Sequence, residues 1–392
     1  MMRAFRRDDD NTNNHPDNRG RDKTISPRMA EGGVEPPAGR NTQQESVMKL
    51  RTGLMGAAAT LAMAPAAFAE RGSDGQLNII MWQAPTLMHP YLSGGTKEVI
   101  AGSLVLEPLA GYDTEGQIYA RLVTEIPSLE NGGIAEDLTS VTWKLRDDVK
   151  WSDGTPLTAD DVVFTAEYCM DPEGGCAQLA KFEGITAVEA VDPQTVKVTF
   201  DSPRADPFSA FVGSQSPILQ KAQFEACKGV NAPTCTDQNF GPIGTGPFRV
   251  TQFLTNDTIS LEANPEYRDA AKPAFATVLV KGGGDAAGAA RSVMETGEFD
   301  YAWNTQLAPD VIAGMEAAGR GKVSAAFGTL VERIHVNLTD PSSSLPEGER
   351  STAAHPHPFL SDPAVRKALS MAIDRALLVE IGYGTSGQPT CN

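Results

Sequence analysis

Histidines and acidic pairs are the residues of this chain whose chemistry would suit catalysis or metal binding. Beyond residue 69 the histidines are His89, His335, His355 and His357. Prolines alternate with the last two, and neither a cysteine nor a carboxylate stands at a metal-ligand spacing from them. The hydrolase patterns GxSxG and HExxH are absent. Asp160 and Asp161 stand at an expected helix start, where carboxylates accept hydrogen bonds from free backbone amides. The sequence therefore predicts no catalytic residue, no metal site and no cofactor.

The main binding candidates lie in the segment WQAPTLMHPY, residues 82–91, which follows an expected strand at 76–82. Ligand sites of open α/β sheets lie beyond the carboxyl ends of their strands. The segment combines aromatic, amide and imidazole groups without a regular pattern. We expect ligand contacts from Trp82, Gln83, Pro85, His89 and Tyr91. The alternative is that Trp82 and Tyr91 pack into a core.

Two further candidates lie at a loop and at a strand end. Small residues in the loop GTGPF permit close approach of the backbone, so Gly244 and Thr245 are candidate ligand contacts. The alternative is a structural loop beside a hinge. Trp303 and Asn304 follow an expected strand that ends at residues 300–301, and we expect them to face the ligand.

Periodicity and turn chemistry indicate the elements that position these residues. Three apolar residues alternate with polar ones, as in a half-buried strand: Val141, Trp143 and Leu145. A turn rich in Asp, Gly and Pro follows, and Thr158 then stands three residues before Asp161, an imperfect capping box for a helix. The patterns also predict hairpins at 188–200 and 249–263, strands at 276–281 and 331–337, and helices at 285–296 and from Asp362 onward.

Residues 143–162 resemble the signature segment of the large solute-binding proteins of peptide-type ABC importers. Their sequence is WKLRDDVKWSDGTPLTADDV. Further segments of that class occur in the same order: GTGPFRV at 244–250, EANPEYR at 262–268, GEFDYAW at 297–303 and DPAVRKALSMAIDRALLVE at 362–380. The resemblance implies an α/β, two-lobed periplasmic-binding-protein fold with an extra small α+β domain. Members of the class continue well beyond this point, so we expect a C-terminally truncated chain with an incomplete second lobe.

The resemblance also implies a division into domains. We expect the first lobe at 70–110 and 191–265, the extra domain at 111–190, and the second lobe at 266–392. The implied function is capture of a small peptide and its delivery to the transmembrane subunits of an ABC permease by a monomeric, non-enzymatic protein. The alternatives are a nickel chelate, an oligosaccharide or an opine on the same scaffold, or a secreted hydrolase. A truncated chain would bind poorly and aggregate.

The first 69 residues have the character of a leader. Residues 1–47 are polar and almost free of large apolar side chains, which indicates a disordered segment or a misassigned start. Residues 48–69 have a basic start, a short apolar stretch and a small-residue cleavage site, so we expect a signal peptide cut after Ala69 and a periplasmic product. The whole chain has 33 basic and 50 acidic residues, a net charge of −17. Such a surface argues against binding to nucleic acid or anionic lipid.

All five cysteines lie beyond the signal peptide. Cys169 and Cys176 bracket one short, turn-rich loop, and Cys227 and Cys235 bracket another. In an exported chain this spacing predicts two local disulfides. Metal binding is the alternative, disfavoured because no CxxC or adjacent histidine supplies more ligands. Cys391 remains without a predicted partner.

Overall fold

The computed structural model describes residues 70–305, 307–325 and 331–390. The expected leader at 1–47, the signal peptide at 48–69 and Cys391 lie outside these residues. The strands are β1 (Gln76–Met81), β2 (Ala110–Tyr112), β3 (Ile118–Ala120), β4 (Ser140–Lys144), β5 (Ile185–Asp192), β6 (Thr195–Phe200), β7 (Phe248–Phe253), β8 (Thr258–Ala263), β9 (Thr277–Gly282) and β10 (Tyr301–Trp303). The α-helices are α1 (Thr96–Gly102), α2 (Ala159–Met170), α3 (Lys221–Phe224), α4 (Thr236–Phe240), α5 (Ala286–Met294), α6 (Pro309–Glu316), α7 (Pro363–Ala372) and α8 (Arg375–Gly382).

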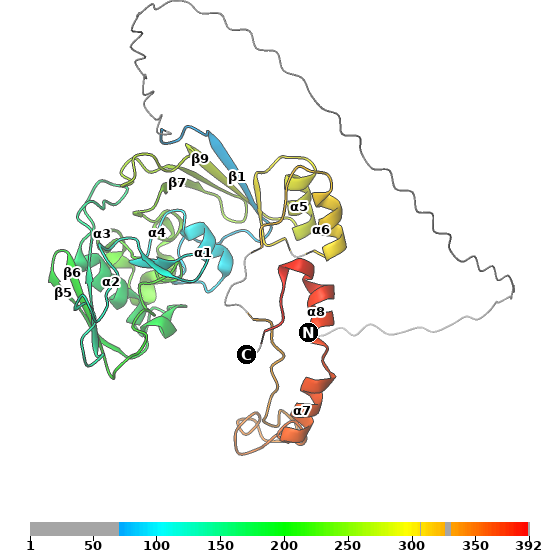
Figure 1. The fold of residues 1–392 in the computed structure, drawn as a ribbon. Helices are drawn as coiled ribbons and strands as arrows, with labels where there is room; N and C mark the ends of the chain where they lie inside the picture. Colours follow the sequence, from blue (N-terminus) through cyan, green and yellow to red (C-terminus); the bar gives the residue numbers. More distant parts are fainter. Residues whose placement is uncertain (1–69, 306, 326–330, 391–392) are drawn as a thin grey trace, which may run out of the picture. The chain divides into compact units, whose positions relative to one another are not determined.

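Five strands form a mixed sheet in the order β10-β1-β9-β8-β7 (Figure 1). Strand β1 runs parallel to both of its neighbours, whereas β8 is antiparallel to β7 and β9. A buried apolar cluster packs on this sheet and includes Met81, Ile259, Leu261, Val278 and Val280. Because β10, β1 and β9 run the same way, their carboxyl ends meet at one edge of the sheet.

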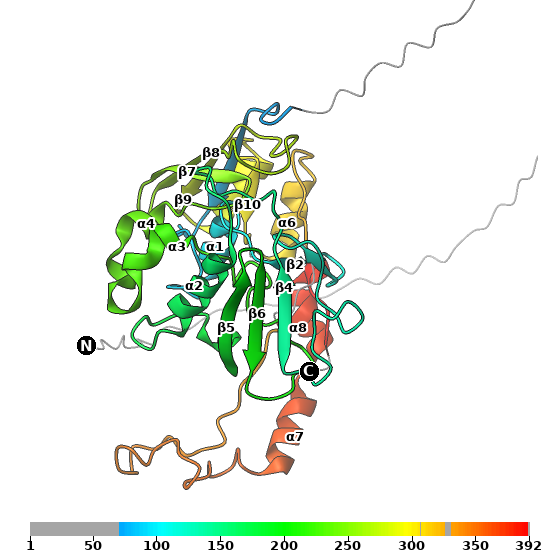
Figure 2. The ribbon, with the colours of Figure 1, turned by 90° about the vertical axis from the view of Figure 1, so that its left-hand side faces the viewer.

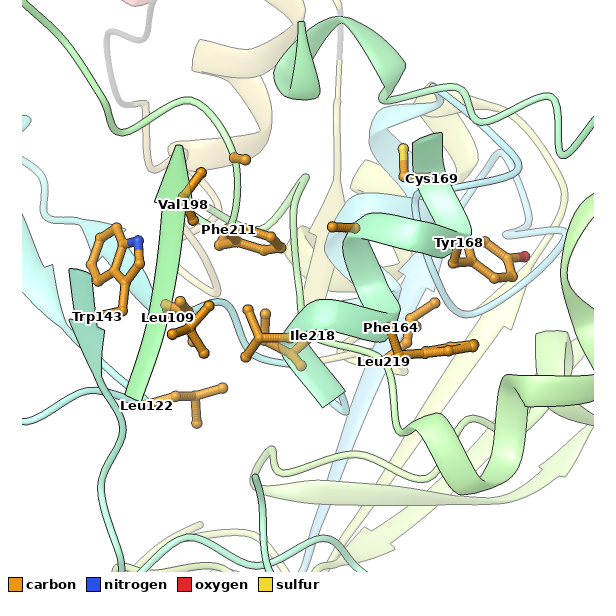
Figure 3. Close-up of a cluster of buried hydrophobic side chains, with 14 of the residues drawn as sticks. Leu109, Leu122, Trp143, Phe164, Tyr168, Cys169, Val198, Phe211, Ile218 and Leu219 are labelled. Atoms are coloured by element: carbon orange, nitrogen blue, oxygen red, sulfur yellow. The ribbon is translucent and has the colours of Figure 1, made fainter. Parts of the chain in front are cut away.

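A second, antiparallel sheet has the order β4-β6-β5 (Figure 2). Helix α2 supplies apolar side chains to the same buried cluster as this sheet. Figure 3 shows Trp143 and Val198 from the strands, Phe164 and Tyr168 from α2, and Phe211 between them. The sequence pattern of this region is thus explained by one core, since the alternating strand residues and the helix face meet in it.

The start of α2 confirms the predicted capping box. Asp161 Oδ2 accepts a hydrogen bond from the Thr158 backbone nitrogen at 3.0 Å. The same carboxylate accepts from the Trp151 indole at 3.3 Å and, through Oδ1, from the Lys221 backbone nitrogen at 2.9 Å. The cap therefore also ties α2 to two segments that are distant from it in sequence.

The strand pairing differs from the expected domain boundaries. Strand β6, expected in the first lobe with 191–265, pairs with β4 and β5 in the small sheet. Strands β9 and β10, expected in the second lobe with 266–392, both pair with β1. Strand pairing therefore crosses the expected boundaries at 191 and 266, because each of these strands has its backbone hydrogen bonds satisfied by neighbours on the other side.

Residues 331–390 contain one wrong prediction and one confirmed one. The expected strand at 331–337 has no regular secondary structure, and Thr339 forms only an isolated bridge to Pro356. Alternation alone does not make a strand where no neighbouring strand pairs with it. Helix α7 begins as predicted, because the Asp362 side chain accepts from the Ala364 backbone nitrogen at 2.8 Å.

Two disulfides close short loops next to the small sheet and α2. Cys169 is bonded to Cys176, and Cys227 is bonded to Cys235. Cys169 and Cys227 are fully buried. Each disulfide therefore links the core to the loop that it closes.

Candidate ligand-binding edge

The edge where β10, β1 and β9 end gathers one part of the predicted site. In the strand register, Met81 lies opposite Trp303 on one side and Gly282 on the other. The residues that follow, Trp82 and Asn304, are therefore neighbours at the sheet edge. Crevices at such edges are where open α/β sheets bind ligands.

A hydrogen bond fixes Trp82 beside Asn304. The Trp82 indole Nε1 donates to the Asn304 backbone oxygen at 2.9 Å. Asn304 has a φ of 55°, a left-handed conformation that asparagine tolerates better than most residues. Trp82 and Asn304 are half-buried, and Gln83 is exposed. The sheet edge thus carries the hydrogen-bonded indole ring of Trp82 and the amide side chains of Gln83 and Asn304.

The end of β9 packs closely under the same segment. A Cβ on Gly282 would overlap Ala84 and approach the Asp257 backbone oxygen at 3.1 Å. Glycine is required here because two backbone segments approach closely. The path of residues 82–84 is therefore set by contact with β9 as well as by the Trp82 hydrogen bond.

Lys97 and Glu98 at the start of α1 hold the next part of the segment. Glu98 Oε1 accepts from the Thr86 backbone nitrogen at 3.0 Å and from Lys97 Nζ at 2.5 Å. Lys97 Nζ also donates to the Ala84 backbone oxygen at 3.0 Å. Burial raises the pKa of the Glu98 carboxyl, but the hydrogen bonds from Lys97 and Thr86 outweigh it and leave the pKa below its usual value.

The sequence interpretation missed Lys97 and Glu98, although the position of Lys97 in a helix gives a reason to expect a partner for it. A lysine in the first turn of a helix lies near the positive end of the helix dipole, where a cation is disfavoured. Such a lysine is expected to have a partner elsewhere, and here the partners are Glu98 and the Ala84 carbonyl.

His89 lies in the interior, away from the edge. Its side chain is fully buried, and Nε2 is 2.9 Å from Asn239 Oδ1. The Tyr91 backbone nitrogen donates to His89 Nδ1 at 3.3 Å, which assigns the proton to Nε2. Burial lowers the pKa of His89 to about 4, although the Asn239 hydrogen bond opposes that shift. A neutral imidazole in this position supports the segment and does not present itself to a ligand.

Tyr91 is also part of the interior. The side chain is fully buried, and its hydroxyl donates to the Pro217 backbone oxygen at 2.5 Å. Burial raises the pKa of the Tyr91 hydroxyl. The packing alternative that the sequence left open is therefore the one that the structure shows for Tyr91.

Gly244 and Thr245 belong to a buried connection between loops. A Cβ on Gly244 would overlap the Val105 backbone oxygen. Thr245 Oγ1 donates to Glu107 Oε2 at 3.1 Å, and Arg268 donates to both oxygens of Glu107, at 2.6 and 2.9 Å. The structural-loop alternative agrees with these contacts, because the side chain of Thr245 is used inside the protein.

The predicted residues thus divide into two groups. Trp82, Gln83 and Asn304 come together at the edge, and Pro85 is buried close behind them in sequence. Trp303 lies in β10, but its side chain packs into the core of the five-stranded sheet. The remaining predicted residues, His89, Tyr91, Gly244 and Thr245, have their side chains or Cα atoms in the interior.

A separate surface depression of about 420 Å³ lies between α2 and β5. Val163, Met170, Val188 and Lys228 line it, and none of the predicted ligand contacts does. Its shallow, exposed form makes it a weaker candidate than the sheet edge. Within the described residues no group of histidines, cysteines and carboxylates could hold a metal ion. None of the described helices is long and apolar enough to cross a membrane.

The parallel strand ends, the capped α2 and the small second sheet make this an α/β protein with a candidate binding edge. The family model for bacterial extracellular solute-binding proteins, family 5 Middle, matches residues 122–391. The chain belongs to that family of solute-binding proteins. Its fold is the two-lobed α/β fold of the solved members.

Relatives show how far the similarity extends. The chain is 24% identical over 331 residues to the glutathione-binding protein GsiB of Escherichia coli strain K12, covering 84% of this chain and 57% of the relative. The structure of the ABC transporter substrate-binding protein CtaP of Listeria monocytogenes has 26% identity and a TM-score of 0.58, covering 80% of this chain and 57% of the other. The Escherichia coli murein tripeptide-binding protein MppA has 23% identity and a TM-score of 0.57, with coverages of 80% and 58%. The chain spans little more than half the length of these relatives.

Proposed function

We propose that this protein is the extracytoplasmic substrate-binding component of an ABC importer and that it captures peptides at the edge formed by β10, β1 and β9. The observation that carries the proposal is the Trp82 indole held against the Asn304 backbone where the parallel strands end. Family membership and the peptide-binding names of two relatives support it. The ligand is bound and released without covalent change, so the protein is not an enzyme.

The edge suits an extended peptide for a physical reason. Such a ligand has unpaired backbone donors and acceptors, and pairing them with protein backbone and amide groups is independent of its side chains. The exposed Gln83 and the half-buried Asn304 offer amides, and the Trp82 ring offers an apolar surface. In a two-lobed protein, closure is favoured by the contacts that the ligand makes only in the closed form.

The proposal includes export to the periplasm after cleavage following Ala69. Anchoring of the chain directly after that position supports it. Arg71 donates to the backbone oxygens of Asn264 and Tyr267, at 2.7 and 2.6 Å, and the Gly72 backbone nitrogen donates to Pro273 at 2.9 Å. We further propose that the protein acts as a monomer that delivers its solute to the transmembrane subunits of a permease.

Calorimetric titration tests the proposal on the exported protein extended to the full length of the relatives that it matches. We expect heat on addition of di- to hexapeptides, and we expect W82A to weaken binding by about tenfold, the loss of one well-packed contact. The matched control is Y112A, which removes an aromatic ring that is 52% exposed on β2. No heat with any peptide, or equal losses for W82A and Y112A, would contradict the proposal.

The same titration separates the non-peptide alternative. The alternative solutes are a nickel chelate, an oligosaccharide and an opine. If one of them gave heat that depends on Trp82 and peptides gave none, the sheet edge would remain the binding site, but the substrate class would change. Recovery of the bound ligand with its mass unchanged is expected in either case, and a cleaved ligand would contradict the non-enzymatic role.

A further inference from the structure

Two disulfide-closed loops hold the same four residues, 88–91, of the segment that leaves β1. The first loop is closed by Cys227 and Cys235 and leads directly into α4. Helix α4 carries Asn239, whose backbone nitrogen donates to the Cys235 oxygen at 2.9 Å. The Asn239 side-chain Nδ2 donates to the Ala232 oxygen inside the loop, also at 2.9 Å. The backbone and the side chain of Asn239 are thus both hydrogen-bonded to residues of the closed loop.

Asn239 connects the first loop to Met88 and His89 through hydrogen bonds. Its backbone oxygen accepts from the Met88 nitrogen at 2.8 Å, and its Oδ1 accepts from His89 Nε2 at 2.9 Å. The amide orientation is fixed by these bonds, because a flipped side chain would lose both the Ala232 and the His89 hydrogen bonds. His89 and Asn239 are buried, so water does not replace the lost partners.

The second loop holds Pro90 and Tyr91. Cys176 closes it onto Cys169 at the end of α2. Directly after the disulfide, the Ala177 nitrogen donates to the Tyr91 oxygen at 2.8 Å, and Gln178 Nε2 donates to the Pro90 oxygen at 3.3 Å. Consecutive residues of one segment are therefore bound by residues that follow the two disulfides: Ala177 comes directly after Cys176, and Asn239 lies one helical turn after Cys235.

We propose that the two disulfides form a redox-sensitive clamp on residues 88–91 that positions the ligand-binding residues Trp82 and Gln83. The part that concerns ligand affinity rests on the proposed function. The connection is short, because only residues 84–87 separate the clamp from the edge, and Lys97 and Glu98 hold Ala84 and Thr86 between them. Asn239 is then a positioning residue that acts on the ligand through His89 and Met88.

The switch is ordinary thiol–disulfide exchange with a dithiol. A thiolate attacks one sulfur of a disulfide, a mixed disulfide forms, and the second thiol displaces the protein sulfur. For each disulfide, two cysteine thiols are formed and one dithiol is oxidised to its cyclic disulfide, so two electrons and two protons reach the protein per disulfide opened. Opening the loops restores conformational freedom to the chain that holds residues 88–91.

Hydrogen exchange of the whole exported protein, with and without dithiothreitol, tests the clamp independently of any ligand. We expect the amides of Met88 and Tyr91 to lose protection at least tenfold on reduction, whereas those of β8 keep theirs. The N239A variant, with both disulfides intact, removes the partner of His89 but keeps the backbone oxygen that binds Met88, so it is expected to give the same loss at Tyr91, whose amide donates to His89. N231A is the matched control, because Asn231 lies in the same loop with an exposed side chain that donates to the Ala226 oxygen.

Titration with the peptide that binds best completes the test. Reduction and N239A are each expected to weaken binding about tenfold, and N231A is expected to leave it unchanged. Unaltered protection at Met88 and Tyr91 after reduction would overturn the clamp, as would equal loss of protection in β8, which would make the disulfides general supports of the fold. Loss of protection confined to residues 88–91 in a protein that binds no solute would support the clamp and overturn only the proposed function.

Discussion

At the scale of single residues, His89 shows how one buried side chain organises the segment behind the candidate site. It donates to Asn239, accepts from Tyr91 and packs edge-on against Phe224 with ring centroids 5.7 Å apart. The hydrogen bond from Tyr91 requires the neutral imidazole, because a protonated Nδ1 cannot accept it. The same requirement makes the stability of the protein depend on pH.

We predict that the protein loses stability as the pH falls from about 6.5 to about 4. The pKa of His89 is about 4 in the folded protein and 6.5 in the unfolded chain, so the unfolded chain binds the proton more readily in this window. The loss amounts to about 3 kcal/mol by pH 4 and is absent above pH 7. Denaturant unfolding at a series of pH values measures it.

The H89Q variant should remove this His89-dependent part of the pH profile, and H335Q is its control because His335 is exposed. If wild type and H89Q changed in parallel between pH 6.5 and 4, the assignment to His89 would be wrong. H335Q is expected to follow the wild type throughout.

Residue types near the site were predictable from the sequence, but their orientations were not. The strand end at Met81 and the mixed segment after it indicated Trp82 and Gln83, and both lie at the edge. The same reasoning favoured ligand contact for His89, which is buried, because the partner that buries it, Asn239, is 150 residues away in sequence. Long-range partners of this kind have no local signal.

At the scale of elements, the buried Glu107 connects three separate parts of the chain. Arg268 binds it through two nitrogens, and Arg121 lies 3.7 Å from its Oε1. Arg268 follows β8, whereas Glu107 follows α1 and Arg121 follows β3. The Glu107 carboxylate thereby links the segment after β8 of the five-stranded sheet to the segment between β3 and β4.

We predict that R268M destabilises the protein by about 3 kcal/mol, because it leaves a buried carboxylate without its main partner. The value lies at the low end for a buried pair, since the Arg268 side chain is 15% exposed. Urea unfolding monitored by circular dichroism measures the change.

The control for R268M is R249M. Arg249 pairs with Glu262 at 2.6 Å, but both side chains are more than 40% exposed. Loss of such a surface pair costs less than about 1 kcal/mol. Equal effects of the two substitutions would show that the Glu107 contacts do not hold the elements together.

Local patterns predicted the elements well and their partners poorly. The capping box at Thr158 and Asp161, the two hairpins and the start of α7 all agree with the structure. The assignment of β9 and β10 to the sheet of β1 was missed, because pairing between parallel strands about 200 residues apart leaves no mark on either strand alone. The prediction of a strand at 331–337 was wrong for the same reason, since an alternating pattern does not provide a neighbouring strand with which to pair.

At the scale of the whole molecule, the acidic composition limits the partners that the protein can bind. The net charge of −17 disfavours nucleic acid and anionic membranes as partners. The chain belongs to a family of solute-binding proteins.

We predict that the protein recovered from the periplasm begins at Glu70. The expected cleavage follows Ala69, and Arg71 is anchored by four backbone oxygens, those of Asn264, Pro265, Tyr267 and Asp269. Intact-mass measurement and amino-terminal sequencing read the start directly. A product that retains residues 48–69, or that is found only in the cytoplasm, would contradict the predicted export.

The most direct test of the central claim is a crystal structure of the exported protein with its solute bound. The account predicts an extended ligand whose backbone lies within hydrogen-bonding distance of residues 82–84 and Asn304, with the Trp82 ring packed against it. A ligand bound in the depression between α2 and β5, or anywhere away from the carboxyl ends of β10, β1 and β9, would contradict it.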